Sequence, residues 1–175
     1  MREILIVPYN NSWPKLFEQE KELIFKSIPV EIYRIHHIGS TSVKGLPSKP
    51  IIDILLEIKK IETLDKLNNY FERIGYECLG EYGIKGRRYY QKGGDDRTHQ
   101  IHAFSTNSTH VISHLAFRDY LIANKDIAEE YENVKSKAAE ACNNDIGVYC
   151  DLKNEFIVKH EKLAVDWWQD TKSLN

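Results

Sequence analysis

The stretch HHIGSTSVKGLPSKPIIDILLEI, residues 36–58, holds two apolar segments joined by a loop of glycine, proline and hydroxyl side chains. Its second segment, IIDILLEI at residues 51–58, has the length and the β-branched content of a buried strand. Because side chains alternate along a strand, the even-numbered residues form a wholly aliphatic face, whereas the odd-numbered face carries Asp53 and Glu57. The pattern predicts a central strand with a functional side; a strand that reaches the rim of the sheet is the alternative.

Outward from this stretch, the hydrophobic pattern mixes strands and helices and then becomes helical alone. Strands are expected at residues 4–7, 32–38, 76–82, 87–92 and 98–104. Helices are expected from about Pro14 to Ser27 and over 61–74, 108–123, 126–141 and 145–169. The expected fold class is therefore α+β, a small mixed sheet flanked by helices, with a helical C-terminal third. We expect one domain over residues 1–175, sheet-rich to about 107 and helical from about 108.

Composition and charge exclude several classes of protein. The 175 residues are 42% hydrophobic and 29% charged, which is typical of a globular protein and excludes disordered, collagen-like and coiled-coil chains. The net charge of -2 argues against nucleic-acid binding and a polybasic membrane anchor, and no apolar run approaches the ~18 residues of a membrane span. The three cysteines are odd in number and lack CxxC spacing, which favours a reduced, cytoplasmic protein.

Positive charge nevertheless gathers in two loop-rich segments. Residues 34–50 hold three basic residues and no acid, and residues 84–100 hold five basic residues against two acids, so each segment carries +3. This local excess predicts a compact positive cleft, sized for a small phosphorylated ligand such as a nucleotide, on a mildly acidic chain. The oligomeric state does not follow from the sequence.

The loop Gly39-Ser40-Thr41-Ser42 directly follows an expected strand. Glycine lets a backbone approach a ligand closely, and hydroxyl groups and free backbone N–H groups bind phosphate oxygens. Lys49, a little downstream, would add positive charge. The alternative is a structural turn without a ligand.

Asp53 stands among aliphatic residues, where a carboxylate is costly to bury without a partner. It is the candidate metal ligand; an ion pair with a lysine or arginine is the alternative. Glu57 shares its face but lies four residues further on, ~13 Å along a strand, so the two carboxylates cannot chelate one metal ion together.

A candidate histidine lies in the segment THQIH, residues 98–102. On a strand, Gln100 and His102 share one face and His99 points to the other. We therefore consider His102 as a metal ligand or a proton-transfer group, because its ordinary pKa of ~6.5 allows either role. A purely structural histidine is the alternative.

Basic side chains complete the candidate set. Arg88 and Lys92 share a strand face with Tyr90, which suits a phosphate with a stacked ring, unless that strand is a solvated hairpin edge. Arg118 and Lys153 lie on expected helices and could reach an anion; the alternative for Lys153 is that its stem packs along the aromatic residues of its own helical face. The pattern does not decide whether the tryptophan pair at 167–168 packs in the core or contacts a partner.

Together these segments resemble the GrpB family. The resemblance covers nearly the whole chain in the family's order, through IVPYNNSWPKLFEQE (6–20), the stretch 36–58, GIKGRRYYQKG (83–93), THQIHAF (98–104), HLAFRDYL (114–121) and YCDLKNEF (149–156). The run HIGSTSVxGLxxKPIIDI is long and specific, so the chain is identified as a member of this family.

The GrpB family is similar in turn to the nucleotidyltransferase superfamily, whose fold is that of polymerase-β-like enzymes. The resemblance implies that Gly39 and Ser40 bind nucleotide phosphates and that Asp53 is the metal-binding strand carboxylate. In that superfamily two carboxylates two residues apart, often joined by a third on a neighbouring strand, hold two divalent metals. Here Ile51 and Leu55 flank Asp53, and His102 stands where the neighbouring strand would supply an acid.

These departures leave two hypotheses. In the first, the chain is a nucleotidyltransferase-like enzyme that holds one Mg²⁺ through Asp53 and the substrate phosphates. In the second, it is a non-catalytic module that binds a nucleotide or another phosphorylated ligand without turnover. Some relatives are fused to dephospho-CoA kinase, which the resemblance connects with nucleotide or coenzyme A metabolism.

Overall fold

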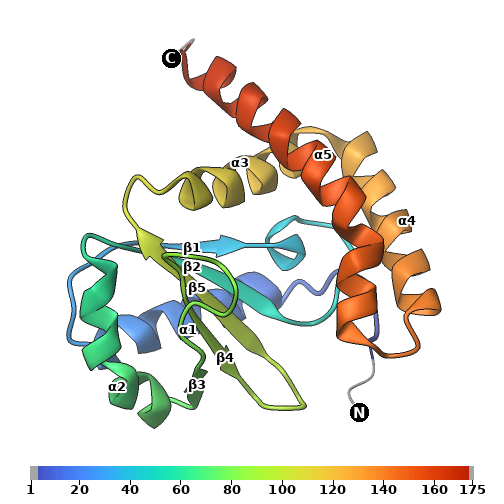
Figure 1. Ribbon diagram of the computed structural model, residues 1–175. Helices are drawn as coiled ribbons and strands as arrows, with labels where there is room; N and C mark the ends of the chain where they lie inside the picture. Colours follow the sequence, from blue (N-terminus) through green and yellow to red (C-terminus); the bar gives the residue numbers. More distant parts are fainter. Residues whose placement is uncertain (1–3, 174–175) are drawn as a thin grey trace.

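The computed structural model describes residues 4–173 and contains a mixed sheet with helices on both of its faces (Figure 1). The part before residue 106 comprises α1 (Trp13–Ser27), β1 (Ile32–Ile38), the 3₁₀ turn η1 (Ser40–Ser42), β2 (Ile52–Ile58), the 3₁₀ helix η2 (Ile61–Lys66), α2 (Asn68–Arg73), β3 (Tyr76–Cys78), β4 (Arg88–Lys92) and β5 (His99–Ser105). The helices α3 (Thr109–Ala123), α4 (Lys125–Ala141) and α5 (Ile146–Ser173) follow.

The five strands run in the order β1-β2-β5-β4-β3. The pair β2–β5 is parallel, and the other neighbouring pairs are antiparallel. The even-numbered side chains of β2 pack against α1, η2 and α2 on a side of the sheet that we call the α1 face. The odd-numbered side chains lie on the opposite side, the α3 face, where Ile38, Leu55 and Phe104 pack under Val111 of α3.

The C-terminal helices form a second body of packing beside the sheet. The 28-residue helix α5 packs along α3 and α4, and Figure 1 shows its last turns continuing past α3. The residues that α5 buries recur at helical spacing: Tyr149, Phe156, His160 and Ala164. No helix within residues 4–173 is long and apolar enough to cross a membrane.

The expected fold class is confirmed: a small mixed sheet flanked by helices, with a helical C-terminal third. Two local expectations are wrong. Within residues 4–7, Val7 alone makes a β-bridge, to Ser48. The segment 61–74 is a 3₁₀ helix followed by a short α-helix rather than one amphipathic helix. The spacing explains this break, because Ile61, Leu64 and Leu67 recur every three residues, which is the period of a 3₁₀ helix.

The burial of the aliphatic face of β2 in the sheet core can be tested by measuring stability. Ile54 is fully buried, so Ile54→Ala should leave a cavity and lower the free energy of unfolding by about 2–5 kcal/mol in urea denaturation. Leu152 on α5 is 49% exposed, and Leu152→Ala should change stability by less than about 0.5 kcal/mol. Equal losses in the two variants would contradict the placement of the core.

Candidate functional site

The turn between β1 and β2 lies directly against the carboxylate of Asp53. Gly39 has a φ of +68°, which favours glycine, and a Cβ at this position would stand 2.5 Å from Asp53 Oδ2. Register pairs Ile38 of β1 with Asp53 of β2, so the chain leaves β1 beside the carboxylate. Glycine at residue 39 therefore lets a backbone turn and a charged side chain occupy adjacent space.

The three hydroxyl groups of the turn do different things. Thr41 is buried; its Oγ1 donates to Ile51 O at 3.1 Å and accepts from His37 Nε2 at 2.9 Å. Ser42 Oγ donates to Gly39 O at 2.5 Å. These two hydroxyls hold the loop in shape, so the expectation that Thr41 contacts phosphate is wrong, and the Ser42 proton is committed to the turn. Ser40 is half-buried and hydrogen-bonds the phenol of Tyr131 from α4.

The hydrogen bonds and the burial of His37 define its tautomer and its charge. Because the Thr41 proton goes to Ile51 O, the His37 ring nitrogen that faces Thr41 carries a hydrogen. Burial lowers the pKa of His37 to about 4, against a smaller opposing effect of Asp53, so this histidine is neutral near pH 7. His37 also stacks on Phe17 of α1 at 4.8 Å between ring centroids. It therefore supports the turn from the α1 face and is not a ligand in the cleft.

Asp53 meets a histidine and an arginine on the α3 face. Leu55 pairs with His102 across the parallel strands, which puts His102 on the same face as Asp53, and its Nε2 lies 3.7 Å from Asp53 Oδ1. Arg87 Nη1 lies 3.5 Å from His102 Nδ1. A guanidinium can only donate, so Nδ1 accepts and neutral His102 presents its N–H towards Asp53. At 3.7 Å this contact is longer than a hydrogen bond, and with a neutral histidine it is not the ion pair with a lysine or arginine that was the alternative for Asp53.

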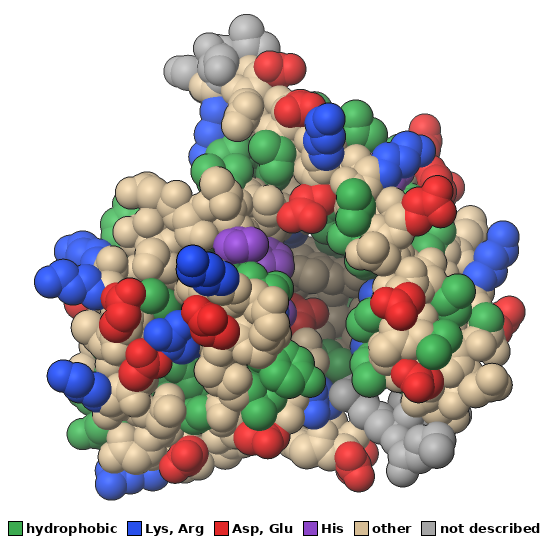
Figure 2. All heavy atoms as spheres, in the orientation of Figure 1, with side chains coloured by type: hydrophobic (Ala, Val, Ile, Leu, Met, Phe, Trp, Pro, Cys, Tyr) green, Lys and Arg blue, Asp and Glu red, His purple; other side chains and the backbone are tan. Residues whose placement is uncertain are grey.

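Figure 2 shows the surface hollowed between the sheet and the α4–α5 pair, with histidine side chains at the rim and an acidic side chain in its depth. The rings of His102 and His114 of α3 lie 5.4 Å apart. Burial, together with the nearby His102, lowers the pKa of His114 to about 3. His114 is therefore neutral near pH 7 and adds no positive charge beside His102.

Three lysines from separate segments converge near the turn. Lys49 and Lys153 each lie over the ring of Tyr149, at 4.6 and 4.3 Å from its centroid. Lys135 of α4 is 2% exposed, lies 4.9 Å from the ring centre of Tyr131, and donates to Pro47 O. Lys49 and Lys153 were expected from the sequence.

Burial and mutual repulsion act on the charges of these lysines. Burial lowers the pKa of Lys153, while the carboxylate of Asp53 acts in the opposite direction. Burial and then the charge of Lys153 lower the pKa of Lys135 to about 7. Lys153 thus connects the group electrostatically, because its charge acts on Lys135 and the Asp53 carboxylate acts on Lys153; we call the three lysines, Asp53 and the turn one unit.

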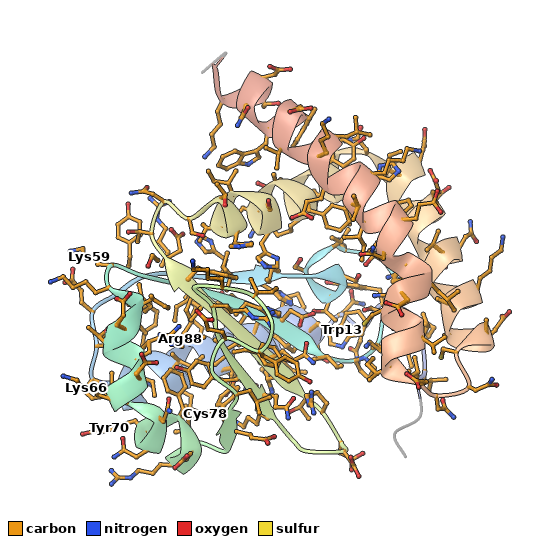
Figure 3. All side chains as sticks on the ribbon, viewed as in Figure 1. Trp13, Lys59, Lys66, Tyr70, Cys78 and Arg88 are labelled. Atoms are coloured by element: carbon orange, nitrogen blue, oxygen red, sulfur yellow. The ribbon has the colours of Figure 1, made fainter. Side chains whose placement is uncertain are left out.

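Arg88 and Lys92 do not belong to this unit, and the expectation that they face Ser40 and Asp53 is wrong. Arg88 pairs with Ala103 and Lys92 with His99 across β4–β5, and those positions lie on the α1 face. Arg88 Nε donates to Asp65 at 2.5 Å; Figure 3 shows Arg88 on the side of the sheet where Lys66 and Tyr70 lie. Lys92 Nζ lies 2.9 Å from Glu20 Oε1 of α1.

Arg118 holds the end of β1 and does not reach into the cleft as a free charge. Its Nη2 lies 2.7 Å from Asp119 Oδ1, and its Nη1 donates to His37 O at 3.1 Å. The tryptophans near the chain end also pack on α3: Trp168 Nε1 donates to Asp119 Oδ2 at 3.3 Å, and Trp167 meets Tyr120 edge to face. These contacts join the last turns of α5 to α3, and Lys172 of α5 also lies 3.6 Å from the ring centre of Trp168.

Sequence reasoning missed Arg87, Tyr131 and Lys135. Arg87 precedes Arg88, which the sequence analysis considered. Arg87 and Tyr89 alternate along the chain, but only the pairing of Tyr89 with His102 across β4–β5 shows that this alternation leads towards the site. Tyr131 and Lys135 are four residues apart on α4, so they share a helical face. No signal in that acidic segment marks the lysine as buried.

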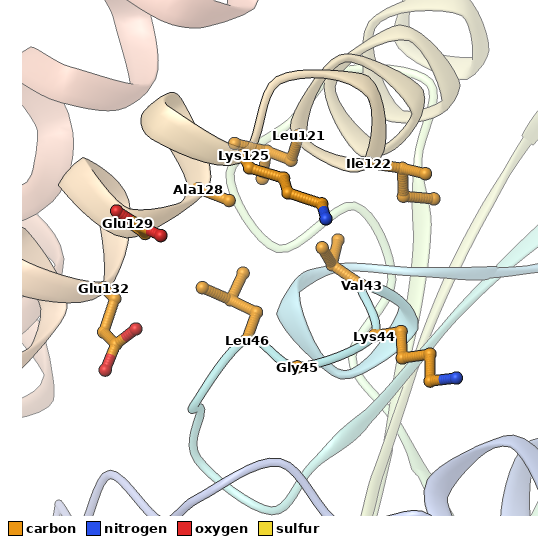
Figure 4. A pocket seen from close by; sticks show the side chains of 10 residues that line it. All are labelled: Val43, Lys44, Gly45, Leu46, Leu121, Ile122, Lys125, Ala128, Glu129 and Glu132. Carbon is orange, nitrogen blue, oxygen red and sulfur yellow. The ribbon is translucent and has the colours of Figure 1, made fainter.

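A separate groove of ≈ 570 Å³ opens on the other side of the η1 loop, between that loop and α3–α4. Figure 4 shows Val43, Leu46, Leu121 and Ile122 on its walls, with the carboxylates of Glu129 and Glu132 at one side. The groove is largely aliphatic, and its charged lining residues balance, with Lys44 and Lys125 against Glu129 and Glu132.

The donor set fits a metal only if the ligand supplies most of the coordination. Within residues 4–173, no group of three or more histidine, cysteine, aspartate or glutamate side chains could hold a metal ion. Glu57 is bound to His36, with 2.6 Å between Oε1 and Nε2, and its side chain is 7% exposed. Asp53 is thus the carboxylate that a Mg²⁺ bound to ligand phosphates would use.

A turn of backbone groups lies against one strand carboxylate, on a small mixed sheet flanked by helices, so the chain is an α+β protein with a candidate site at the end of its first two strands. The chain belongs to the GrpB protein family, whose profile matches residues 3–163. The UPF0157 protein YqkA of Bacillus subtilis is 40% identical over 174 residues, 99% of this chain, and this chain spans about half (51%) of that relative's length. The glutamate-rich protein GrpB of Alkalihalophilus pseudofirmus is 34% identical over 89% of this chain and 92% of the relative.

Solved structures agree with this assignment. The crystal structure of the conserved protein GrpB from Enterococcus faecalis has a TM-score of 0.89 and 40% identity, over 94% of this chain and 99% of that one.

A more distant relative by sequence is the dephospho-CoA kinase of Mycobacterium tuberculosis. It is 23% identical over 187 residues, covering 93% of this chain and 46% of the kinase.

The contact between residue 39 and Asp53 can be tested by stability. Gly39→Ala should cost about 1–2 kcal/mol for the left-handed backbone and an additional amount for displacing the carboxylate. Gly45 has a φ of +88° and open space around it, so Gly45→Ala should cost the backbone part alone. In an Asp53→Ala background, the cost of Gly39→Ala should fall towards that of Gly45→Ala in urea denaturation. Equal costs in both backgrounds would contradict the contact.

The buried lysine predicts a pH dependence of folding. Between pH 7 and about 9.5 the unfolded chain keeps the Lys135 proton, whereas the folded chain, with a pKa of about 7 against an ordinary 10.5, releases it. Stability should therefore rise with pH in this window, by up to about 1 kcal/mol per pH unit.

Lys135→Met should flatten that rise, and the lowered pKa of Lys153 should leave a remainder of the same sign. Lys159 is exposed on α5, so Lys159→Met is the matched control and should keep the slope of the wild type. Urea denaturation at several pH values measures each slope. An unchanged slope in Lys135→Met would show that Lys135 does not titrate as described.

Proposed function

We propose that this protein is a nucleotidyltransferase-like enzyme that binds a nucleotide, or another phosphorylated small molecule, together with one Mg²⁺. The single observation that carries the proposal is the contact of the Gly39 turn with Asp53, beside three convergent lysines. A turn rich in backbone N–H groups attracts phosphate, while a carboxylate alone repels it. A divalent cation between the carboxylate and the phosphates, with the lysines around them, removes that conflict.

Each part of the site has a distinct task in this proposal. The backbone of residues 39–42 and the Ser40 hydroxyl would bind phosphate oxygens, and Lys49 and Lys153 would neutralise their charge. Asp53 would hold the metal, which when bound polarises the phosphate that is transferred. His102, whose N–H faces Asp53 because Arg87 occupies its other nitrogen, would donate a hydrogen bond at Nε2. This tautomer disfavours metal ligation through Nε2, so His102 fits a hydrogen-bond donor better than a metal ligand.

A non-catalytic phosphate-binding module is the second candidate, and one observation favours it. Ile51 and Leu55 stand two residues on either side of Asp53, and the carboxylate of Glu57 is engaged by His36. A two-metal mechanism needs further carboxylates within reach of the same ions. A site with one carboxylate can bind a phosphorylated ligand with its metal and still lack turnover.

The relationship to a dephospho-CoA kinase supports the class of ligand. About half of that kinase is similar to nearly the whole of this chain. A region that accompanies an enzyme named for coenzyme A chemistry fits recognition of a phosphorylated nucleotide-like compound. We therefore propose nucleotides and nucleotide-containing coenzymes as the first ligands to test.

The decisive measurement pairs binding with turnover. Isothermal titration with nucleoside triphosphates, with and without Mg²⁺, should detect binding, and pyrophosphate release in the presence of a metabolite pool should detect transfer. Asp53→Asn should abolish the metal-dependent release while metal-free binding persists, because the amide loses the charge that holds the metal. Binding without pyrophosphate release under any condition would favour the binding module.

The lysines give an independent test of the anion site. Lys153→Met should weaken triphosphate binding about tenfold or more, since a charge-assisted hydrogen bond contributes about 1.5–3 kcal/mol. Lys159→Met on the same helix should leave binding unchanged, because Lys159 is exposed on another part of α5. Equal affinities in the two variants would contradict the placement of the phosphates near Lys153.

A further inference from the structure

We propose that the stacked pair Tyr82–Tyr89 is a binding surface for the planar ring of the ligand, so that the substrate class is a nucleotide recognised through its base. This inference rests on the proposed function and adds a second subsite to it. In the sequence analysis Tyr90 was the tyrosine considered for such a role, but Tyr90 is buried on the α1 face against Phe71.

Tyr82 combines an exposed ring with a backbone conformation that tyrosine rarely adopts. Its side chain belongs to the loop between β3 and β4, is 63% exposed, and its φ is +44°, in the left-handed region. Asparagine or glycine occupies that region at lower cost than tyrosine, and most of the Tyr82 side chain stays exposed despite its contact with Tyr89. A strained backbone that displays an aromatic ring points to a use for the ring.

The rest of the loop is held firmly. Arg87 donates to Glu81 O at 3.2 Å and to Tyr82 O at 2.5 Å, and Gly86 N donates to Glu81 Oε1 at 2.7 Å. Ile84 packs against the cluster of Ile38, Leu55, Phe104 and Val111, which anchors the loop over the α3 face. A loop fixed at both its base and its apolar anchor presents Tyr82 in a defined position and reduces the ordering cost of binding.

The two tyrosines make one platform. Their rings are stacked, with 5.1 Å between centroids and 13° between planes. The Arg87 guanidinium lies 4.8 Å from the centre of the Tyr89 ring, which fixes that ring within the loop. The exposed ring of Tyr82 thus continues a stack that is already rigid, and a nucleobase can extend it because every base has a flat π-face.

The platform is connected to Asp53 by direct contacts. Tyr89 lies 5.3 Å from the ring of His102, and His102 lies 3.7 Å from Asp53. The base on Tyr82 and the phosphates at the Gly39 turn would therefore lie at the two ends of the row Tyr82, Tyr89, His102 and Asp53.

The test compares ligands with and without a base. Titration calorimetry should be run with ATP, UTP and inorganic tripolyphosphate on the wild type, Tyr82→Gly, Tyr82→Trp and the control Tyr33→Ala. Tyr33 is 50% exposed on β1, away from the proposed platform. Tyr82→Gly relieves the left-handed backbone, so it should fold at least as well as the wild type in urea denaturation.

We expect Tyr82→Gly to weaken nucleoside triphosphates by roughly 5- to 100-fold, the loss typical of one base–aromatic stack, and to leave tripolyphosphate unchanged. Tyr82→Trp and Tyr33→Ala should bind like the wild type. Unchanged nucleotide affinity in Tyr82→Gly, or an equal loss for tripolyphosphate, would overturn the platform while leaving the phosphate site intact. A wild type that binds none of the three compounds would overturn the proposed function itself, and the platform with it.

Discussion

The close approach of Gly39 to the Asp53 carboxylate is the constraint on which the site depends. With any side chain at residue 39, Asp53 Oδ2 would be displaced, because a Cβ there would stand 2.5 Å away. The approach brings together backbone groups that attract an anion and a carboxylate that repels one. Other parts of the site respond to this conflict: the lysines that surround Tyr149 and Tyr131, the N–H of His102 that faces the carboxylate, and the cation that we propose.

Much of the sheet could be predicted from alternation within each strand. The separation of Asp53 from the aliphatic face of β2, and of His102 from His99, follows from a period of two and holds in the structure. What alternation could not provide is which face of β4 joins which face of β2, since that depends on register across the intervening strand β5. Arg88 and Lys92 were grouped correctly with each other but on the wrong side of the sheet, whereas Arg87 comes to His102.

The helical contribution to the site was less accessible to sequence reasoning for a different reason. Lys153 could be recognised by its spacing from Tyr149 on one helix, which is a local relation. Lys135 lies in a segment whose charges read as a solvated helix face, and its burial results from packing against the η1 loop and α5. Similarly, the sequence does not show that Thr41 donates to Ile51 O while Ser40 hydrogen-bonds Tyr131. Those assignments depend on where α4 docks.

The buried lysines lower the stability of the unliganded fold and would raise the affinity of the proposed site. Burial makes the charged form of Lys135 and Lys153 unfavourable, and the charge of Lys153 adds to that cost for Lys135. A phosphate among them would favour the charged form, so the same groups that weaken the unliganded fold would strengthen binding. Hydrophobic residues at these positions would pack without such a cost. Within residues 4–173, the ammonium groups of Lys135 and Lys153 contact a carbonyl oxygen and aromatic rings and form no salt bridge with a carboxylate. Local rules that are broken in this way concentrate at functional sites. The lysines and the close approach at Gly39 both act on Asp53 or lie against it, which is where the ligand of the proposed function would bind.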